Sequence, residues 1–481
     1  MNSVAHMKPK IGLFTGGIET YWKDCGMEEL PALLEADSRR LADKLGEQFE
    51  VVHPGIAGNV EESTQRAREI REAGVDVVVI YHATYVDDAM SFAVVDELGP
   101  NIFTILLHSQ GLKGITDTID MVPAGTTWGN NSAVQICGTY KRMRPELRFG
   151  YVFGELDNPD IYREIEVYVR AWGAVRKLRG SKIVYMPHRC TQVPMYDTYP
   201  DDTMMMAQTG VDIDFLSTIE LVDEMGQVSD ADTDALYNDI TSRCEVVEPT
   251  EEEIRLACRQ AIALENMVRR HDVDALAIDT GPEITPRTGM LPALGMALLI
   301  DKGFVVATEG DLSVSVGGLL LQSLTGNPVH FWEHLWFDEE KNWILGGHEG
   351  GSAGFSMARK DEKPKLRCTQ YVDFRHWEGA PLNAVLPEFI TEPGPVTIIN
   401  LFRGVEAYEM RYSTGLSVDT RARPVHFEHT IFQPDIPLRD YFTRMKDVGV
   451  CHHFGLVHGS VGPELEKVAE MLGMKCVCLT N

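Results

Sequence analysis

The chain has 481 residues, 44% of them hydrophobic, and its formal net charge is −28. That length allows about three domains, and so acidic a surface repels nucleic acid and anionic lipid, so neither is an expected partner. No window approaches the ~18 consecutive apolar residues of a spanning helix, and the polar first residues are not typical of a secretory signal. Nine scattered cysteines predict no disulfide framework, so we expect a cytoplasmic protein.

The first two thirds of the chain alternate short apolar runs with amphipathic stretches, a pattern typical of an α/β protein with parallel sheets. We predict strands at 10–15, 75–82, 101–108, 149–153, 182–186, 275–279 and 304–308, and helices at 28–49, 159–178, 251–271 and 291–302. We interpret them as two Rossmann-like doubly wound domains, at residues 7–146 and 147–327.

The pattern changes after Gly326, where β-rich segments dominate. Strands are predicted at 329–337, 365–372, 396–401, 408–416 and 424–432, and helices at 438–446 and 463–472. We therefore expect a third, C-terminal domain at 328–481 that contains an antiparallel sheet or barrel.

The first candidate for chemistry is the segment 304–312, FVVATEGDL. Functional side chains gather just past the carboxyl ends of strands in open α/β sheets, and Glu309 sits at such an end. Gly310 lets the backbone approach a ligand closely. The alternative is that Glu309 and Asp311 only cap the next helix.

The second candidate is Glu333 in the segment 329–337, VHFWEHLWF. His330, Glu333 and His334 spell the H-x-x-E-H motif of inverted zinc peptidases, which requires a helix. Aromatic and β-branched residues favour a strand here instead, and in a strand both histidines point away from Glu333. The peptidase is therefore the weaker interpretation.

Two further candidates are histidines beside turns. His348 lies among glycines in 343–354, WILGGHEGGSAG, where the adjacent Glu349 is an alternative ligand. His452 and His453 form a pair in 449–460, GVCHHFGLVHGS. Adjacent side chains diverge, so only one of the pair is expected to face a site. Two carboxylates and two imidazoles together suit six-coordinate Mn²⁺, Mg²⁺ or Co²⁺ better than a closed structural zinc site.

These segments resemble the L-arabinose isomerase and L-fucose isomerase superfamily, and more closely its arabinose isomerase branch. The family's metal glutamates match Glu309 in Thr308-Glu309-Gly310-Asp311 and Glu333 in Phe331-Trp332-Glu333. Its metal histidines match His348, after Gly346-Gly347, and His453, the second of the pair. The resemblance implies Mn²⁺ dependence, two Rossmann-like domains with a barrel-containing third, and homo-oligomers, trimers or hexamers, with sites at subunit interfaces.

The resemblance extends to residues expected to contact the substrate. His108 and Gln110 look like the family's His-x-Gln strand end, and Glu19 lies in the loop after the first strand. It implies an aldose–ketose isomerase that acts on a free monosaccharide, L-arabinose-like or L-fucose-like, through a cis-enediol. Glu309 and Glu333 would be its acid–base pair as well as ligands.

Two other functions stay open at this point. One is an epimerase or lyase that acts on a sugar or sugar acid with the same metal site. The other is a non-catalytic sugar-binding module, since two Rossmann-like domains around a cleft also describe solute-binding proteins. Such a module would not need four metal-type residues.

Overall fold

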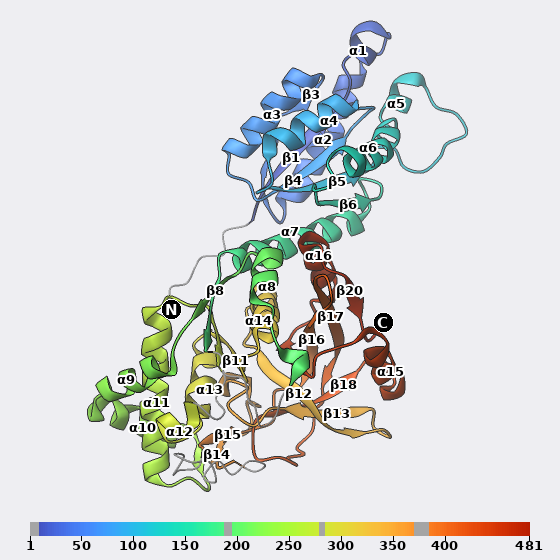
Figure 1. The fold of residues 1–481 in the computed structure, drawn as a ribbon. Helices are drawn as coiled ribbons and strands as arrows, with labels where there is room; N and C mark the ends of the chain where they lie inside the picture. Colours follow the sequence, from blue (N-terminus) through green and yellow to red (C-terminus); the bar gives the residue numbers. More distant parts are fainter. Residues whose placement is uncertain (1–8, 187–194, 279–283, 370–383) are drawn as a thin grey trace. The chain divides into compact units, whose positions relative to one another are not determined.

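The computed structural model describes residues 9–186, 195–278, 284–369 and 384–481. The protein is mixed α/β, with parallel sheets and a β-rich C-terminal region (Figure 1). It divides into two compact units, Met1–Gly173 and Ala174–Asn481. Among the described residues, no helix combines the length and the hydrophobicity needed to cross a bilayer.

The first unit is built on a six-stranded parallel sheet in the order β2-β1-β4-β5-β6, with β3 paired to β1. Its strands are β1 (Lys10–Gly16), β2 (Glu50–Val52), β3 (Ile56–Ala57), β4 (Val77–His82), β5 (Phe103–His108) and β6 (Phe149–Phe153). β4 and β5 are buried along their whole length, as apolar strands covered on both faces are.

Helices separate these strands in the chain. They are α1 (Thr20–Asp24), α2 (Leu30–Gly46), α3 (Val60–Glu72), α4 (Asp88–Leu98), α5 (Met121–Gly125), α6 (Gly129–Met143) and α7 (Pro159–Arg179).

The position of β6 corrects one detail of the sequence prediction. This strand was assigned to the second domain, yet it pairs with β5 in the first sheet. A strand's own sequence does not encode which sheet it joins. The division into three domains stays a prediction.

The second unit contains a four-stranded parallel sheet in the order β11-β10-β7-β8. The strands are β7 (Lys182–Met186), β8 (Asp212–Phe215), β10 (Ala275–Ile278) and β11 (Val305–Thr308). The accompanying helices are η1 (Tyr196–Thr198), α8 (Asp202–Thr209), α9 (Thr218–Gln227), α10 (Asp230–Arg243), α11 (Glu251–Arg270), α12 (Thr285–Thr288), α13 (Ala293–Asp301) and α14 (Leu312–Thr325).

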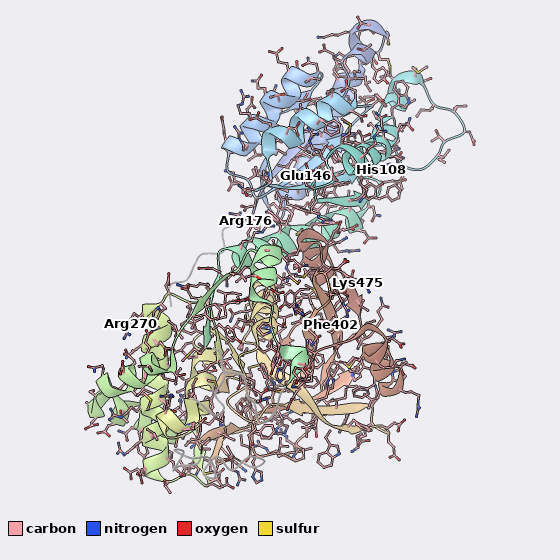
Figure 2. All side chains as sticks on the ribbon, in the orientation of Figure 1. His108, Glu146, Arg176, Arg270, Phe402 and Lys475 are labelled. Carbon is pink, nitrogen blue, oxygen red and sulfur yellow. The ribbon has the colours of Figure 1, made fainter. Side chains whose placement is uncertain are left out.

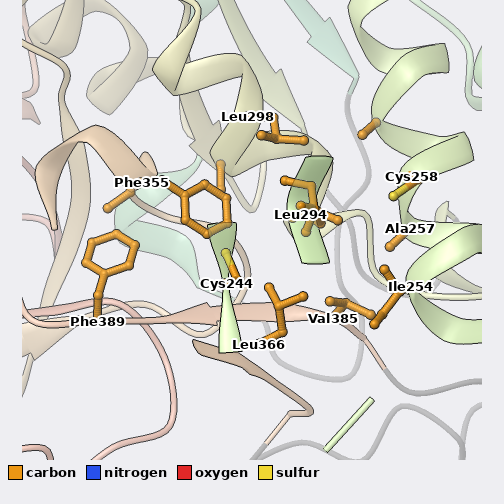
Figure 3. Close-up of a cluster of buried hydrophobic side chains, with 14 of the residues drawn as sticks. Cys244, Ile254, Ala257, Cys258, Leu294, Leu298, Phe355, Leu366, Val385 and Phe389 are labelled. Atoms are coloured by element: carbon orange, nitrogen blue, oxygen red, sulfur yellow. The ribbon is translucent and has the colours of Figure 1, made fainter. Parts of the chain in front are cut away.

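A large apolar cluster connects these helices to a small three-stranded sheet, β9 (Glu245–Val246), β14 (Lys365–Arg367) and β15 (Leu386–Glu388). Figure 3 shows Ile254 and Cys258 of α11 facing Leu294 of α13, with Val385 next to Ile254 and Leu366 on the lower side of the cluster. Helix α11 begins at Glu251, as predicted, because Thr250 and Glu253 form a capping box. Of the strand predicted at 365–372, residues 365–367 are confirmed, and those from 370 lie outside the described residues.

The β-rich region is a seven-stranded sheet in the order β16-β19-β12-β13-β18-β17-β20, and a further pairing of β16 with β17 closes six of these strands into a ring. The strands are β12 (His330–Asp338), β13 (Trp343–Gly347), β16 (Gly394–Arg403), β17 (Tyr408–Ser417), β18 (His429–Pro434), β19 (His453–His458) and β20 (Cys476–Cys478). Helices η3 (Phe355–Met357), α15 (Leu438–Val448) and α16 (Gly462–Leu472) complete the region. The strand predicted at 424–432 was wrong in its first half, because pairing begins only at His429.

Candidate active site

The strand register of the β-rich sheet brings three of the predicted residues together. β12 lies between β19 and β13, and both pairings are antiparallel. Glu333 is directly opposite His453 on one side and Gly347, the residue before His348, on the other. Opposed residues in antiparallel strands have Cα atoms only about 4.5–5.5 Å apart. The register therefore gathers Glu333, His348 and His453, which are widely separated in the chain.

Glu309 comes from the other sheet of the same unit, at the carboxyl end of β11. Its backbone φ is 55°, in the left-handed region that a residue with a side chain seldom adopts. The carboxylate lies 3.4 Å from His348 Nε2 through Oε1 and 3.3 Å from His453 Nε2 through Oε2. The capping alternative holds for Asp311, whose Oδ1 accepts a hydrogen bond from Val314 N at 3.0 Å, and not for Glu309.

Asp311 has a second role that the sequence did not indicate. Its Oδ2 lies 3.0 Å from His453 Nδ1, and both side chains are buried. A carboxylate at Nδ1 fixes the neutral ring as the Nδ1–H tautomer and leaves the Nε2 lone pair free to bind a cation. Within the described part of the chain, the buried His453 Nε2 has no hydrogen-bond partner, although Glu309 Oε2 lies 3.3 Å away.

His348 completes the cluster from the turn after β13. Its side chain is 12% exposed, and its ring stands edge-on to Phe331, with centroids 5.1 Å apart. Phe331 also contacts the ring of His453, at 4.6 Å between centroids. Glu349, the alternative ligand, belongs to neither of the groups of possible metal ligands that the described residues form.

The electrostatics of the cluster are those of a site rich in negative charge. Burial works to raise the pKa of Glu309, but the adjacent imidazoles of His348 and His453 outweigh it and hold that pKa far below its usual range. Burial works to lower the pKa of His453, but Asp311 and Glu309 outweigh it and raise the pKa to about 10. The pKa of His348 is raised against its burial by Glu309.

Two overlapping groups have the donor atoms of a metal site, each within 4.8 Å of one another: Glu333, His348 and His453, and Glu309, His452 and His453. Such donors, with an imidazole nitrogen that lacks a hydrogen bond, fit a divalent cation of the Mn²⁺ type. A cation would replace the protons that the carboxylates otherwise hold on the imidazoles.

His452 differs from its neighbour in its surroundings. Its Nδ1 lies 2.7 Å from Asp197 Oδ2, which also accepts a hydrogen bond from the His452 backbone N at 2.9 Å. The side chain is 39% exposed, whereas that of His453 is fully buried. His453 belongs to both groups of donors and His452 to one. Asp197 carried no sequence signal, because nothing local marks a carboxylate that meets a histidine 255 residues away.

The H-x-x-E-H segment lies on β12 and is therefore a strand, as predicted. His330 and His334 are on the opposite face from Glu333. His330 is fully buried and bonds Thr430 Oγ1 through Nδ1 at 3.2 Å. Burial lowers the pKa of both histidines to about 3, so both are neutral at pH 7. The helical geometry that a zinc peptidase needs is absent from this described segment.

The residues expected to contact the substrate belong to the first unit. His108 ends β5, is 9% exposed and bonds the Tyr151 hydroxyl (Figure 2). Gln110 Oε1 accepts from Asn130 Nδ2 at 2.7 Å. The Glu19 carboxylate forms an ion pair with Lys23 at 2.8 Å. The role of these three residues in substrate binding stays a prediction.

Comparison with known proteins identifies relatives of this chain. A family model for the L-arabinose isomerase central domain matches residues 197–324. The chain is related to the L-arabinose isomerases. The matched region includes Asp197, Glu309 and Asp311 and ends before Glu333, His348 and His453.

Three curated proteins extend the relationship. Sulfoquinovose isomerase from Clostridium sp. (strain MSTE9) is 23% identical over 68% of this chain and 71% of that protein. L-arabinose isomerase from Acidothermus cellulolyticus is 22% identical over 68% of this chain and 66% of its own. The enzyme of that name from Pediococcus pentosaceus is 24% identical over 67% and 69%. By this relationship the chain is an enzyme of the aldose–ketose isomerase class.

A solved structure of a sugar ABC transport substrate-binding protein from Bordetella parapertussis also aligns, at 12% identity over 68% of this chain and 83% of that chain. Its TM-score is 0.16, too low to support a shared fold. The sugar-binding module therefore gains nothing from this alignment.

Proposed function

We propose that this protein is a divalent-metal-dependent isomerase that interconverts an aldose and a ketose, acting on a free monosaccharide. The observation that carries the proposal is the position of Glu333 between His453 and the turn that holds His348, with Glu309 within 3.4 Å of both imidazoles. We propose Glu309, Glu333, His348 and His453 as ligands of Mn²⁺, with Mg²⁺ or Co²⁺ as substitutes.

Each residue then has a chemical task. One carboxylate of the pair Glu309 and Glu333 removes the proton from C2 of the open-chain aldose and returns it to C1, through a cis-enediol. The other carboxylate moves the proton from the O2 oxygen to the O1 oxygen, so that atoms and charge balance. Asp311 holds His453 in one tautomer. When bound, the metal supplies Lewis-acid stabilisation of negative charge on the sugar oxygens.

The wider assignments rest on the resemblance. We propose two Rossmann-like domains and a barrel-containing C-terminal domain, in a homo-oligomer whose sites lie at subunit interfaces. His108, Gln110 and Glu19 are proposed as substrate-binding residues on the same ground. The relatives suggest L-arabinose and sulfoquinovose as candidate substrates, and the resemblance adds L-fucose-like sugars. A cytoplasmic location fits free sugars of this kind.

The test is a panel of substrates incubated with Mn²⁺-loaded protein, with the products identified by NMR. The panel contains L-arabinose, L-fucose, sulfoquinovose, other aldoses and a set of sugar acids. Formation of a ketose supports the proposal. Epimerised or dehydrated products from the sugar acids, with no ketose from any aldose, would support the epimerase or lyase on the same scaffold instead.

A further inference from the structure

A buried carboxylate lies beneath the turn that carries His348. We define the His348 loop as residues 347–354, which run from the last residue of β13 to the start of η3. Glu428, just before β18, accepts a hydrogen bond from the Ser352 backbone N through Oε1, and the same oxygen lies 3.3 Å from Ala353 N. Glu428 is therefore bound to the far end of this loop by its side chain.

The same loop peptide is held from the opposite side. Ser352 O accepts a hydrogen bond from Phe331 N at 2.8 Å. The Phe331 ring in turn contacts both His348 and His453. The peptide groups around Ser352 thus connect the Glu428 carboxylate to the aromatic residue on which both candidate imidazoles pack.

The loop backbone leaves little room at two of its glycines. A Cβ at Gly347 would lie 2.5 Å from Glu428 O, and one at Gly351 would lie 2.1 Å from Ala293 O. Gly351 also has a φ of 83°, which favours glycine. Close backbone contacts therefore fix the loop at Gly347 and Gly351, and the Glu428 carboxylate holds Ser352 and Ala353, which follow Gly351.

Glu428 is a costly residue for a purely structural task. It is fully buried, and its Oε2 has no hydrogen-bond partner among the residues that the structure describes. Burial raises its pKa to about 7 against the effect of its backbone hydrogen bonds. An apolar residue would avoid the cost of a buried carboxylate but would offer Ser352 N no acceptor.

We propose that Glu428 is a positioning residue of the candidate metal site, whose carboxylate holds the His348 loop so that the His348 imidazole stays beside Glu309 and Glu333. This inference rests on the proposed function, since it gives Glu428 a role only if His348 is a ligand. Glu428 does not touch the reacting atoms and acts through Ser352.

Two substitutions of Glu428 by side chains of similar length test this positioning role. Glu428→Met removes the acceptor oxygen, whereas Glu428→Gln keeps an acceptor for Ser352 N. Mn²⁺ affinity is measured by titration calorimetry, and hydrogen exchange of residues 347–354 by mass spectrometry in the metal-free protein. We expect Glu428→Met to weaken Mn²⁺ binding about 10–100-fold, as loss of an outer-shell partner does, and to speed exchange in the loop. Glu428→Gln should stay close to the parent in both.

A matched control is Glu224→Gln, since Glu224 is also a buried carboxylate but bonds Arg270 and Asn266 away from the site. It should lose stability and keep Mn²⁺ affinity and loop exchange. Glu428→Asp, which retracts the carboxylate by one methylene, replaces the methionine variant if that variant does not fold.

The outcomes separate the two proposals. Parental Mn²⁺ affinity in a folded Glu428→Met protein would overturn the positioning role and leave the metal site standing. Absence of Mn²⁺ binding in the parent would overturn the proposed function and the positioning role with it, and faster loop exchange in Glu428→Met would then identify Glu428 as a structural tether only.

Discussion

Glu333 and His453 face each other across the antiparallel pairing of β12 with β19. This one register places a carboxylate and a buried imidazole side by side. On its other side, Glu333 is opposite Gly347, so the next residue, His348, joins the same group. The pairing of β12 with β19 and β13 therefore brings these three candidate ligands together.

The first prediction concerns the two carboxylates. Glu309→Gln and Glu333→Gln keep the size of the side chain but remove its charge and its capacity as a base. At saturating Mn²⁺ we expect turnover to fall roughly 10²–10⁴-fold in each, the usual worth of general acid–base help. Exchange of the substrate C2 proton with deuterated solvent, followed by NMR, should fall as well, with folding retained.

The control is Glu349→Gln, next to His348 but outside both groups of donors. It should keep most of the Mn²⁺ affinity and turnover. Recovery of parental turnover in Glu309→Gln or Glu333→Gln once Mn²⁺ is saturating would show that this glutamate is at most a ligand.

The second prediction separates the adjacent histidines. His453 is fully buried and belongs to both groups of donors, whereas His452 is half-exposed and bonds Asp197. We expect His453→Ala to lose Mn²⁺ affinity by at least about 100-fold, more than loss of an outer-shell partner costs. His452→Ala should lose less. Titration calorimetry of both variants measures the order, and the reverse order would assign the ligand to His452.

The third prediction concerns stability and pH at Glu428. Its pKa in the folded protein is raised to about 7, above the ordinary value of 4.5, because the carboxyl is buried. Between these pH values the folded protein holds a proton that the unfolded chain has released. The proton on Glu428 therefore stabilises the folded protein fully below about pH 4.5, and this stabilisation is lost as pH rises through 7. The free energy of unfolding should change by an amount on the order of 3 kcal/mol over this range.

Glu428→Gln should remove this dependence. Relative to the parent, the variant should gain stability between pH 5 and pH 8, measured as the difference in the midpoint of denaturant unfolding. The stability difference between Glu224→Gln and the parent should depend on pH with the opposite sign. Burial of Glu224 is outweighed by Arg270 and Asn266, which lower its pKa. Its stabilising effect is lost as pH falls. A parent-to-variant difference at Glu428 that is constant across this range would contradict the raised pKa.

The sequence could predict the individual site residues but not how they meet. Glu309 follows an apolar strand, and Glu333 lies in an aromatic one, so local patterns placed both correctly at the level of secondary structure. The pairing of β12 with β19 and the bond from Asp311 to His453 join residues far apart in the chain, 142 positions in the second case. No local periodicity encodes such contacts. For the same reason, the sequence indicated a cap at Asp311 and nothing at Glu428.

The last prediction concerns Asp311, whose two carboxylate oxygens have separate tasks. Oδ1 caps α14 through Val314 N, and Oδ2 lies at His453 Nδ1. Asp311→Asn keeps an oxygen for the cap, so the helix should lose little stability, since good N-cap residues are nearly interchangeable. Its amide nitrogen, however, donates to His453 Nδ1 where the carboxylate accepted. The ring must then carry its proton on Nε2, the nitrogen that faces Glu309 and would bind the metal.

We therefore expect Asp311→Asn to weaken Mn²⁺ binding about 10–100-fold while the unfolding midpoint stays near that of the parent. Asp311→Ala serves as the comparison, because it loses the cap as well and should cost roughly 0.5–2 kcal/mol of stability in addition. ¹⁵N NMR of labelled histidine distinguishes the two neutral tautomers and reads His453 directly. If Asp311→Asn keeps the parental Mn²⁺ affinity, the carboxylate is only a helix cap, and His453 does not depend on it for its tautomer.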